Sequence, residues 1–246
     1  MSRTERRRAL ITGGSGDIGA AICRTLASQG LEVIVHANSR PDRAHALAEE
    51  IRGQGGRALA ACFDVTDEGA TADSINDLLE GGAIHVVVNN AGMHRDMPMA
   101  GMAASDWRKV VDVNLHGFFN VTQPLLLPMA RQRWGRIIGI SSVAAILGNR
   151  GQSNYAAAKA GMHGVVRSLA LEMASRSITV NAIAPGIIDG EMTREVFDKA
   201  TIASMVPMKR PGLPEEVADL VGFLASDKAS YITGQVVSIN GGMGGG

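Results

Sequence analysis

Short apolar segments recur along the chain, and several are apolar at consecutive positions rather than at alternate ones. Such segments are typical of parallel strands that are covered on both faces of a sheet. The pattern predicts strands at residues 9–12, 32–36, 58–64, 86–89, 136–141, 178–184 and 236–240.

The segments between these strands favour helices, at residues 18–29, 42–54, 67–79, 105–133, 154–175 and 214–225. Alternating strands and helices predict an α/β, Rossmann-type fold, in which a doubly wound parallel sheet of about seven strands carries helices on both faces. Because no linker or internal repeat interrupts the pattern, we expect residues 1–246 to form a single domain.

Two segments depart from this alternation. Residues 185–214 hold weak helical pieces, including 193–199, and are too long for an ordinary connection. Because they follow the end of a strand, we predict that residues 187–213 form a substrate lid. Within residues 105–133, Pro124 and Pro128 each remove a backbone donor, which predicts a kink or an early break of that helix.

A glycine-rich loop follows the first predicted strand and opens a helix. Glycines allow a tight turn there and let backbone N–H groups approach a pyrophosphate. A plain structural turn is the alternative, but the position at the first strand of a parallel sheet favours a dinucleotide site. The candidate cofactor-binding residues in this loop are Gly13, Ser15, Gly16, Asp17, Ile18 and Gly19.

The end of the second strand bears on the choice of cofactor. A carboxylate there would hold the ribose hydroxyls of NAD and repel the additional phosphate of NADP. The sequence instead reads His36-Ala37-Asn38-Ser39-Arg40, with an arginine and no carboxylate. Asn38 and Arg40 therefore favour NADPH; the alternative is that Arg40 is a solvated loop residue, and NADH is not excluded.

Two further turns lie at the same predicted edge of the sheet. Asp64, before Val65, could accept hydrogen bonds from an adenine amine or could cap the following turn. Asn89-Asn90-Ala91-Gly92 follows the fourth strand, and its amides could brace the phosphate loop and line the adenosine ribose. An isolated Asn-Gly turn is often no more than a turn, but its placement makes Asn90, Ala91 and Gly92 candidates for cofactor binding.

Tyr155 and Lys159 are four residues apart at the start of a predicted helix, so they share one helix face. A nearby ammonium group stabilises a phenolate and would lower the pKa of the tyrosine, which is about 10 in free Tyr. Tyr155 could then serve as the proton donor when a carbonyl is reduced. The alternative is a half-buried tyrosine beside a surface lysine.

Two other residues support the catalytic interpretation. Ser142 ends the fifth strand, where its hydroxyl could hold a substrate carbonyl. Asn114 is polar within an apolar helical stretch; a buried Asn needs partners, and one role would be to hold a water that connects Lys159 to solvent.

Taken together, these motifs resemble those of the short-chain dehydrogenase/reductase family, from about residue 9 to residue 243. The resemblance implies that Asn114, Ser142, Tyr155 and Lys159 form a catalytic tetrad, that Lys159 also holds the cofactor ribose, and that Pro185, Gly186 and Ile188 lie against the nicotinamide. The motifs that carry it are TGGSGDIG at 12–19, NNAG at 89–92, Asn114, Ser142, YAAAK at 155–159 and Pro185-Gly186.

A narrower resemblance, to the 3-oxoacyl-[acyl-carrier-protein] reductases of type II fatty acid synthesis, rests on residues 151–161, 231–235 and 240–243. It implies that an acidic carrier protein docks on basic residues beside the active-site mouth, here Arg133 and Arg176, which could also be ordinary surface arginines. It further implies a homotetramer in which the helices at 105–133 and 154–175, and the region of the last strand, pair with those of neighbouring subunits.

The chain also departs from the pattern of that family. Asp17 replaces the usual Gly of the phosphate loop, and Gly16 stands where a basic residue is common. An Asp is favourable at a helix N-terminus, but its charge would oppose a pyrophosphate that it faced. Gly190 replaces a Thr that in many relatives helps to hold the nicotinamide side.

Composition limits the partners. Lys+Arg and Asp+Glu number 24 each, so the formal net charge of zero argues against a nucleic-acid partner. The basic cluster of Arg3, Arg6, Arg7 and Arg8 favours a solvated leader over a binding arm.

Without an apolar run of about 18 residues or a signal-peptide core, we expect a soluble, cytoplasmic protein without a membrane partner. Cys23 and Cys62 fit no zinc pattern and are predicted to be reduced, packed thiols.

The expected activity is the NADPH-dependent reduction of a 3-oxoacyl thioester to the 3-hydroxyacyl thioester. One alternative keeps the chemistry and changes the substrate to an acyl-CoA, a steroid, a sugar or another secondary alcohol, with NAD(H) as cofactor. A second alternative, a dinucleotide-binding protein without turnover, conflicts with the full tetrad.

Overall fold

A seven-stranded parallel sheet forms the centre of the computed structural model, which describes residues 7–191, 193 and 198–244. The strand order is β3-β2-β1-β4-β5-β6-β7, so the chain reverses direction across the sheet between β1 and β4 and the predicted doubly wound fold is confirmed. The strands are β1 (Arg8–Ile11), β2 (Glu32–Ala37), β3 (Arg57–Cys62), β4 (Val86–Asn89), β5 (Gly135–Ile140), β6 (Ile178–Pro185) and β7 (Val236–Ile239).

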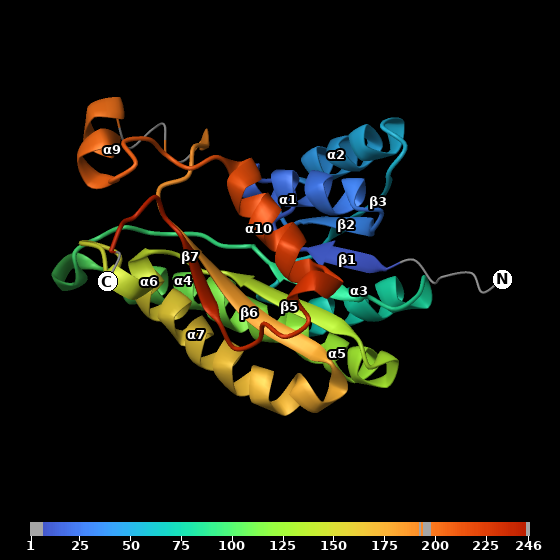
Figure 1. Ribbon diagram of the computed structural model, residues 1–246. Helices are drawn as coiled ribbons and strands as arrows, with labels where there is room; N and C mark the ends of the chain where they lie inside the picture. Colours follow the sequence, from blue (N-terminus) through green and yellow to red (C-terminus); the bar gives the residue numbers. More distant parts are fainter. Residues whose placement is uncertain (1–6, 192, 194–197, 245–246) are drawn as a thin grey trace.

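Helices cover both faces of the sheet (Figure 1). One core layer lies between the sheet and α1 (Asp17–Ser28), α2 (Pro41–Gly53) and α10 (Pro214–Ala225). The other lies between the sheet and α3 (Glu68–Glu80), α5 (Gly117–Gln132) and α7 (Ser153–Met173). Shorter helices are α4 (Ala104–Val111), α6 (Ala144–Leu147) and α9 (Lys199–Met205), with 3₁₀ turns at Met99–Gly101, Ala174–Arg176 and Asp227–Ala229.

The predicted helix at 105–133 is interrupted, but not at its prolines. A π-helical turn, Asp112–His116, separates α4 from α5, and α5 runs through both Pro124 and Pro128. Nδ2 of Asn114 donates to the Val110 carbonyl oxygen at 2.8 Å, an acceptor that an α-helix would give to a backbone N–H. A side chain inserted into the backbone ladder is a common cause of such irregularity. The expected early break at the prolines was therefore wrong.

The expected solvated basic leader is also wrong where the structure describes it. Arg8 lies inside β1 with 5% of its surface exposed, and its Nε donates to Glu32 at 3.0 Å. Arg7 pairs with Asp227 at 3.0 Å and lies over the ring of Trp134. Both arginines are therefore structural, whereas Arg3 and Arg6 lie outside the described residues.

Both cysteines are free, as expected, but only Cys23 is packed. Cys62 is exposed at the end of β3, the edge strand of the sheet, beside which the described part of the chain places no further strand.

The segment between β6 and α10 holds α9, which projects away from the sheet at the upper left of Figure 1. An isolated parallel bridge joins Ile188 to Gly212 and ties the two ends of the segment together. Residues 194–197, most of the helical piece expected at 193–199, lie outside the described residues.

Candidate active site

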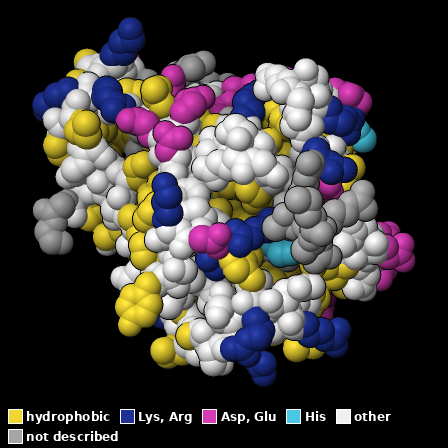
Figure 2. Space-filling model, turned by 45° about the vertical axis from the view of Figure 1, so that its right-hand side comes forward, with side chains coloured by type: hydrophobic (Ala, Val, Ile, Leu, Met, Phe, Trp, Pro, Cys, Tyr) yellow, Lys and Arg dark blue, Asp and Glu magenta, His cyan; other side chains and the backbone are white. Residues whose placement is uncertain are grey.

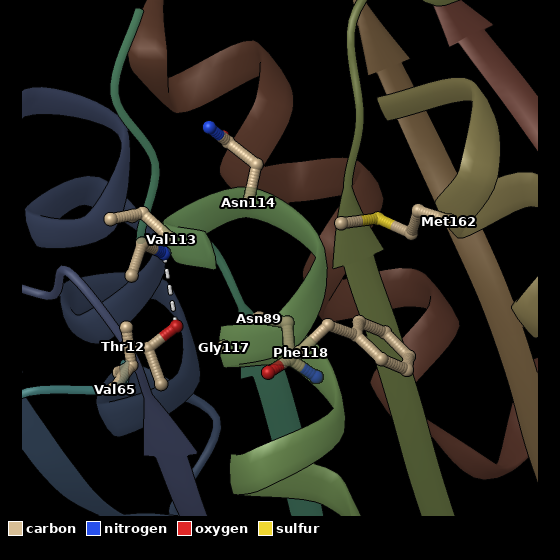
Figure 3. Close-up of a pocket in the computed structure, with 9 residues that line it drawn as sticks. Thr12, Val65, Asn89, Val113, Asn114, Gly117, Phe118 and Met162 are labelled. Atoms are coloured by element: carbon tan, nitrogen blue, oxygen red, sulfur yellow. Dashed lines mark hydrogen bonds between the residues drawn. The ribbon is translucent and has the colours of Figure 1, made fainter. Parts of the chain in front are cut away.

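A cleft of about 1080 Å³ opens at the carboxyl ends of the strands. It brings together every candidate catalytic and cofactor-binding residue named from the sequence except Asn114, which lines a small adjoining pocket (Figure 3). The cleft-lining candidates are Gly13, Ser15, Gly16, Asp17, Ile18, Gly19, Asn38, Arg40, Asp64, Val65, Asn90, Ala91, Gly92, Ser142, Tyr155, Lys159, Pro185, Gly186 and Ile188.

The glycine-rich loop is braced by the turn after β4. Thr12 Oγ1 accepts hydrogen bonds from the backbone N–H groups of Asn90 at 3.0 Å and Ala91 at 2.9 Å, the second of which is drawn in Figure 3. Nδ2 of Asn90 donates to the carbonyl oxygens of Thr12 and Gly13. Gly13 has φ +61°, and a Cβ there would press on the backbone of Ala91, so glycine is required at this position. Asn90 therefore braces the phosphate loop, as predicted.

His36 is a loop contact that the sequence analysis did not identify. Its Nδ1 accepts a hydrogen bond from the Gly13 N–H at 3.1 Å, which places the proton on Nε2, 2.9 Å from the Phe63 carbonyl oxygen. Burial lowers the pKa of His36, so the neutral ring is favoured. One polar residue within the apolar β2 segment was the available signal. The neutral imidazole therefore joins the phosphate loop to the residue that follows β3.

Asp64 performs the turn-capping role that the sequence left open. Its Oδ1 accepts hydrogen bonds from the backbone N–H of Thr66 at 2.9 Å and from its hydroxyl at 2.8 Å. The backbone hydrogen bond from Thr66 is the main reason that the pKa of Asp64 is lowered, and a hydrogen bond from Asn38 contributes. Asp64 also lines the cleft, so an adenine contact stays a prediction.

Asp17 turns its carboxylate towards the chain that follows β6. Its Oδ2 accepts a hydrogen bond from the Glu191 N–H at 2.9 Å. A Cβ on Gly190 would overlap this carboxylate. Two of the three departures from the family pattern, Asp17 and Gly190, are thus adjacent in space, and the first occupies the room that the second leaves.

Tyr155 and Ser142 meet in the cleft. Burial raises the pKa of Tyr155, a hydrogen bond with Ser142 lowers it, and the negative charge of Asp96 raises it. The pKa of Tyr155 is therefore above its ordinary value. The expectation that Lys159 lowers this pKa is wrong when only the side chains of the protein are considered. Nζ of Lys159 lies 5.7 Å from the Tyr155 ring centre and donates to the Ile140 carbonyl oxygen at 2.8 Å.

Lys159 and Asn114 are both deeply buried, with 2% and 1% of their surface exposed. Burial lowers the pKa of Lys159 to about 8. Asn114 donates to the Met93 and Val110 carbonyl oxygens, while its buried Oδ1 has no hydrogen-bond partner among the described residues. A Cβ on Gly92 would lie 2.8 Å from this oxygen and 3.4 Å from the lysine nitrogen. An unpaired acceptor therefore lies close to the ammonium group.

Arg133 and Arg176 are not beside the cleft of their own chain. Arg133 caps α5 directly before β5, and Arg176 lies just before β6. Because the strands are parallel, both arginines are at the amino edge of the sheet, opposite the cleft. Nη2 of Arg133 donates to the Ser175 carbonyl oxygen at 3.1 Å, so the two exposed arginines are neighbours.

Figure 2 shows positive and negative side chains interspersed on one face of the molecule, in keeping with the net charge of zero. Among the described helices, none is long and apolar enough to cross a membrane. The described residues also contain no group of His, Cys, Asp and Glu side chains placed to hold a metal ion.

Comparison with known proteins covers nearly the whole chain. A family model described as Enoyl-(Acyl carrier protein) reductase matches residues 14–244. The chain is 45% identical over 236 residues to the 3-oxoacyl-[acyl-carrier-protein] reductase FabG of Aggregatibacter actinomycetemcomitans, covering 95% of this chain and 98% of that protein. It is 42% identical to the reductase of the same name from Staphylococcus epidermidis, covering 96% of this chain and 98% of that protein.

The corresponding Pseudomonas aeruginosa reductase is 43% identical, and the match covers 96% of each chain. These matches agree with the doubly wound sheet and with the cleft that joins the glycine-rich loop to Tyr155 and Lys159. The chain therefore belongs to the short-chain dehydrogenase/reductase family of oxidoreductases.

Proposed function

We propose that the protein reduces a 3-oxoacyl thioester, linked to acyl carrier protein, to the 3-hydroxyacyl thioester with NADPH in the cytoplasm. The observation that carries this proposal is that Ser142, Tyr155 and Lys159 share one cleft with the braced glycine loop. The names of the reductases that match nearly the full chain support the substrate class.

The residues of the cleft fit a dinucleotide. At Gly13 a Cβ would meet Ala91, and the absence of a side chain there leaves the loop backbone open to the cleft. Backbone N–H groups at the start of α1 would face the pyrophosphate, while Asn38 and Arg40 would face the adenosine phosphate. Pro185, Gly186 and Ile188 would lie against the nicotinamide, and Lys159 would hold its ribose. When bound, the cofactor supplies the hydride for the ketone carbon.

The protein's own groups would handle the carbonyl and the proton. The Ser142 hydroxyl, whose oxygen already accepts a hydrogen bond from the Ala144 N–H at 3.1 Å, can donate a hydrogen bond to the substrate carbonyl oxygen and keep its own proton. Tyr155 would donate its phenolic proton to that oxygen as the hydroxyl product forms. The raised pKa of Tyr155 keeps the phenol protonated and ready for reduction.

Lys159 and Asn114 would supply the next proton. The free Oδ1 of Asn114 can accept a hydrogen bond from a water molecule that also contacts the Lys159 ammonium, which gives a route from solvent to Tyr155. The described part of the segment at 187–213 would cover the substrate, since Met205 of α9 lines the same cleft.

The substitution Tyr155→Phe tests the chemistry. It should leave NADPH affinity nearly intact and abolish turnover, because it removes one oxygen and keeps the ring. Substantial residual reductase activity would contradict the proposed role. A substrate panel of acetoacetyl-carrier protein, acetoacetyl-CoA and simple ketones, each with NADPH and with NADH, would identify the substrate and cofactor together.

We further propose a homotetramer in which α5 and α7 pair with their counterparts. These helices expose large apolar side chains, including Leu127 at 70% and Leu171 at 84% of their surface. In a two-fold symmetric, antiparallel pairing, the ends of α5 and α7 in one subunit lie near the beginnings of the same helices in the other. Such pairing would carry Arg133 of the partner subunit towards the cleft, where an acidic carrier could dock.

Charge reversal tests the docking proposal. Arg133→Glu and Arg176→Glu should raise KM for the carrier-linked substrate and leave KM for the CoA-linked substrate unchanged. Arg131→Glu, at an exposed position of the same helix end, is the matched control. Equal effects on both substrates would argue against carrier docking at these residues.

A further inference from the structure

Three segments that are distant in sequence meet over the part of the cleft that would hold the adenosine phosphate. The glycine-rich loop contributes Asp17, the chain after β6 contributes Gly190 and Glu191, and the start of α2 contributes Arg40 and Arg43. The contacts among them are polar and ionic, and Asp17, Glu191 and Arg43 have no role in the reaction as proposed above.

Asp17 fixes the main chain of Glu191. The Glu191 N–H donates to Asp17 Oδ2 at 2.9 Å, and Gly190 leaves the space that this carboxylate fills. With its backbone held at this point, Glu191 directs its side chain towards the two arginines.

The Glu191 carboxylate forms ion pairs with the guanidinium groups of Arg40 and Arg43. One oxygen lies 3.7 Å from Arg40 Nη1, and the other lies 3.4 Å from Arg43 Nη1. The three side chains are about half exposed, at 49%, 50% and 61% of their surface, so the pairs are open to exchange with an anion from solution. Exposed pairs of this kind are weak, which makes such an exchange inexpensive.

We propose that Glu191 determines cofactor specificity by competing with the 2′-phosphate of NADPH for Arg40 and Arg43, and that Asp17 positions Glu191 for this competition. The inference rests on the proposed use of NADPH. NADH has hydroxyl groups only at this ribose, so it can bind without separating the ion pairs. Glu191 therefore reduces the preference for NADPH that the two arginines provide.

Binding to the full-length protein tests the proposal, with dissociation constants for NADPH, NADH, 2′,5′-ADP and 5′-AMP measured by calorimetry. Glu191→Gln should tighten NADPH and 2′,5′-ADP about three- to fivefold, the range that an exposed ion pair allows, and leave NADH and 5′-AMP unchanged. The gain in affinity for NADPH and 2′,5′-ADP should be smaller at high salt concentration. Glu80→Gln, which removes an exposed carboxylate at the end of α3, is the control for net charge and should change none of the four values.

The positioning role of Asp17 predicts coupling. In an Asp17→Ala background, Glu191→Gln should change the ratio of NADPH to NADH affinity by less than it does in the native chain. A purely structural effect of Asp17 would alter the affinity for both cofactors and leave this change in the ratio intact.

The proposal is overturned if Glu191→Gln leaves the NADPH affinity unchanged or weakens it, or tightens NADH equally. The positioning role is overturned if the two substitutions are additive in the affinity ratio. These outcomes are distinct from failure of the proposed function, which would appear as absent 3-oxoacyl reduction with cofactor binding intact.

Discussion

The side-chain oxygen of Asn114 lies 2.8 Å from the point where a Cβ on residue 92 would be. Gly92 therefore allows the π-helical turn to bring its buried, unpaired acceptor close to the Lys159 ammonium. A side chain on residue 92 would press on the Asn114 oxygen and come within 3.4 Å of the Lys159 nitrogen.

Gly92→Ala should consequently impair both the fold and the reaction. We expect a loss of about 1–3 kcal/mol in the free energy of unfolding, because a methyl group is forced into a packed site. The kcat should fall more than the cofactor affinity, since Asn114 and Lys159 are displaced. Urea unfolding and steady-state kinetics measure the two effects. Gly53→Ala is the control, because a Cβ there meets nothing within 4 Å and should not destabilise; equal behaviour of the two variants would contradict the packing argument.

Asp17 and Gly190 should behave as a coupled pair in stability. Gly190→Thr alone is expected to destabilise by about 1–3 kcal/mol, because its Cβ overlaps the Asp17 carboxylate. Gly190 does not have a positive φ, so a side chain is not excluded by the backbone. In Asp17→Gly/Gly190→Thr most of this loss should be recovered. A double-mutant cycle by thermal unfolding measures the coupling, and simple additivity would show that the clash is relieved elsewhere.

Replacing Lys159 should abolish activity while it increases the stability of the fold. Its pKa of about 8 in the folded protein is below the 10.5 of an ordinary lysine, so the buried charge destabilises the fold below pH 8. That cost disappears as the pH rises from 8 to 10.5. Lys159→Met should thus be inactive, yet more stable than the native chain by about 1–3 kcal/mol at neutral pH.

Denaturant midpoints across this pH range would measure the difference, which should close at the alkaline end. Lys228→Met, at an exposed position, should show no such pH dependence. A Lys159→Met protein that is less stable at pH 7 would mean that the hydrogen bond to Ile140 outweighs the buried charge.

His36 should make the protein sensitive to acid. Burial lowers its pKa in the folded state, so the unfolded chain takes up a proton first as the pH falls through about 6.5. Stability should be full above that pH and decline below it, because a second ring proton breaks the bond from the Gly13 N–H. His36→Gln should reduce the loss of stability below that pH. Burial also lowers the pKa of His163, so His163 would contribute to the remaining loss. Melting temperatures from pH 5 to 8 test this, and an equal reduction in the exposed control His45→Gln would argue against His36.

Local patterns were enough to predict the sheet and most of the candidate site. Consecutive apolar residues located the strands, and glycine spacing together with the Tyr155-Lys159 pair located the cleft residues. The prediction succeeded because parallel strands place their carboxyl ends at one edge, so residues that follow different strands meet. The same reasoning named Asn114 as a candidate but did not predict that it lies in a π-helical turn and lines a separate small pocket.

Other features depend on contacts between distant parts of the chain. The burial of Arg8, the exposure of Cys62 and the position of Arg133 at the far edge of the sheet were all missed, because each depends on which element lies alongside. The raised pKa of Tyr155 likewise comes from burial by its surroundings rather than from Lys159.

The sequence by itself determined the fold class, the family resemblance and the residue types available at the carboxyl edge of the sheet, because these follow from local periodicity and motif spacing. Only the tertiary structure decided that Asp17 meets Gly190 and that Glu191 occupies Arg40 and Arg43. Folding brings these residues together from segments that are about 150 or more positions apart in the sequence. A local sequence pattern cannot show that residues so far apart along the chain are in contact.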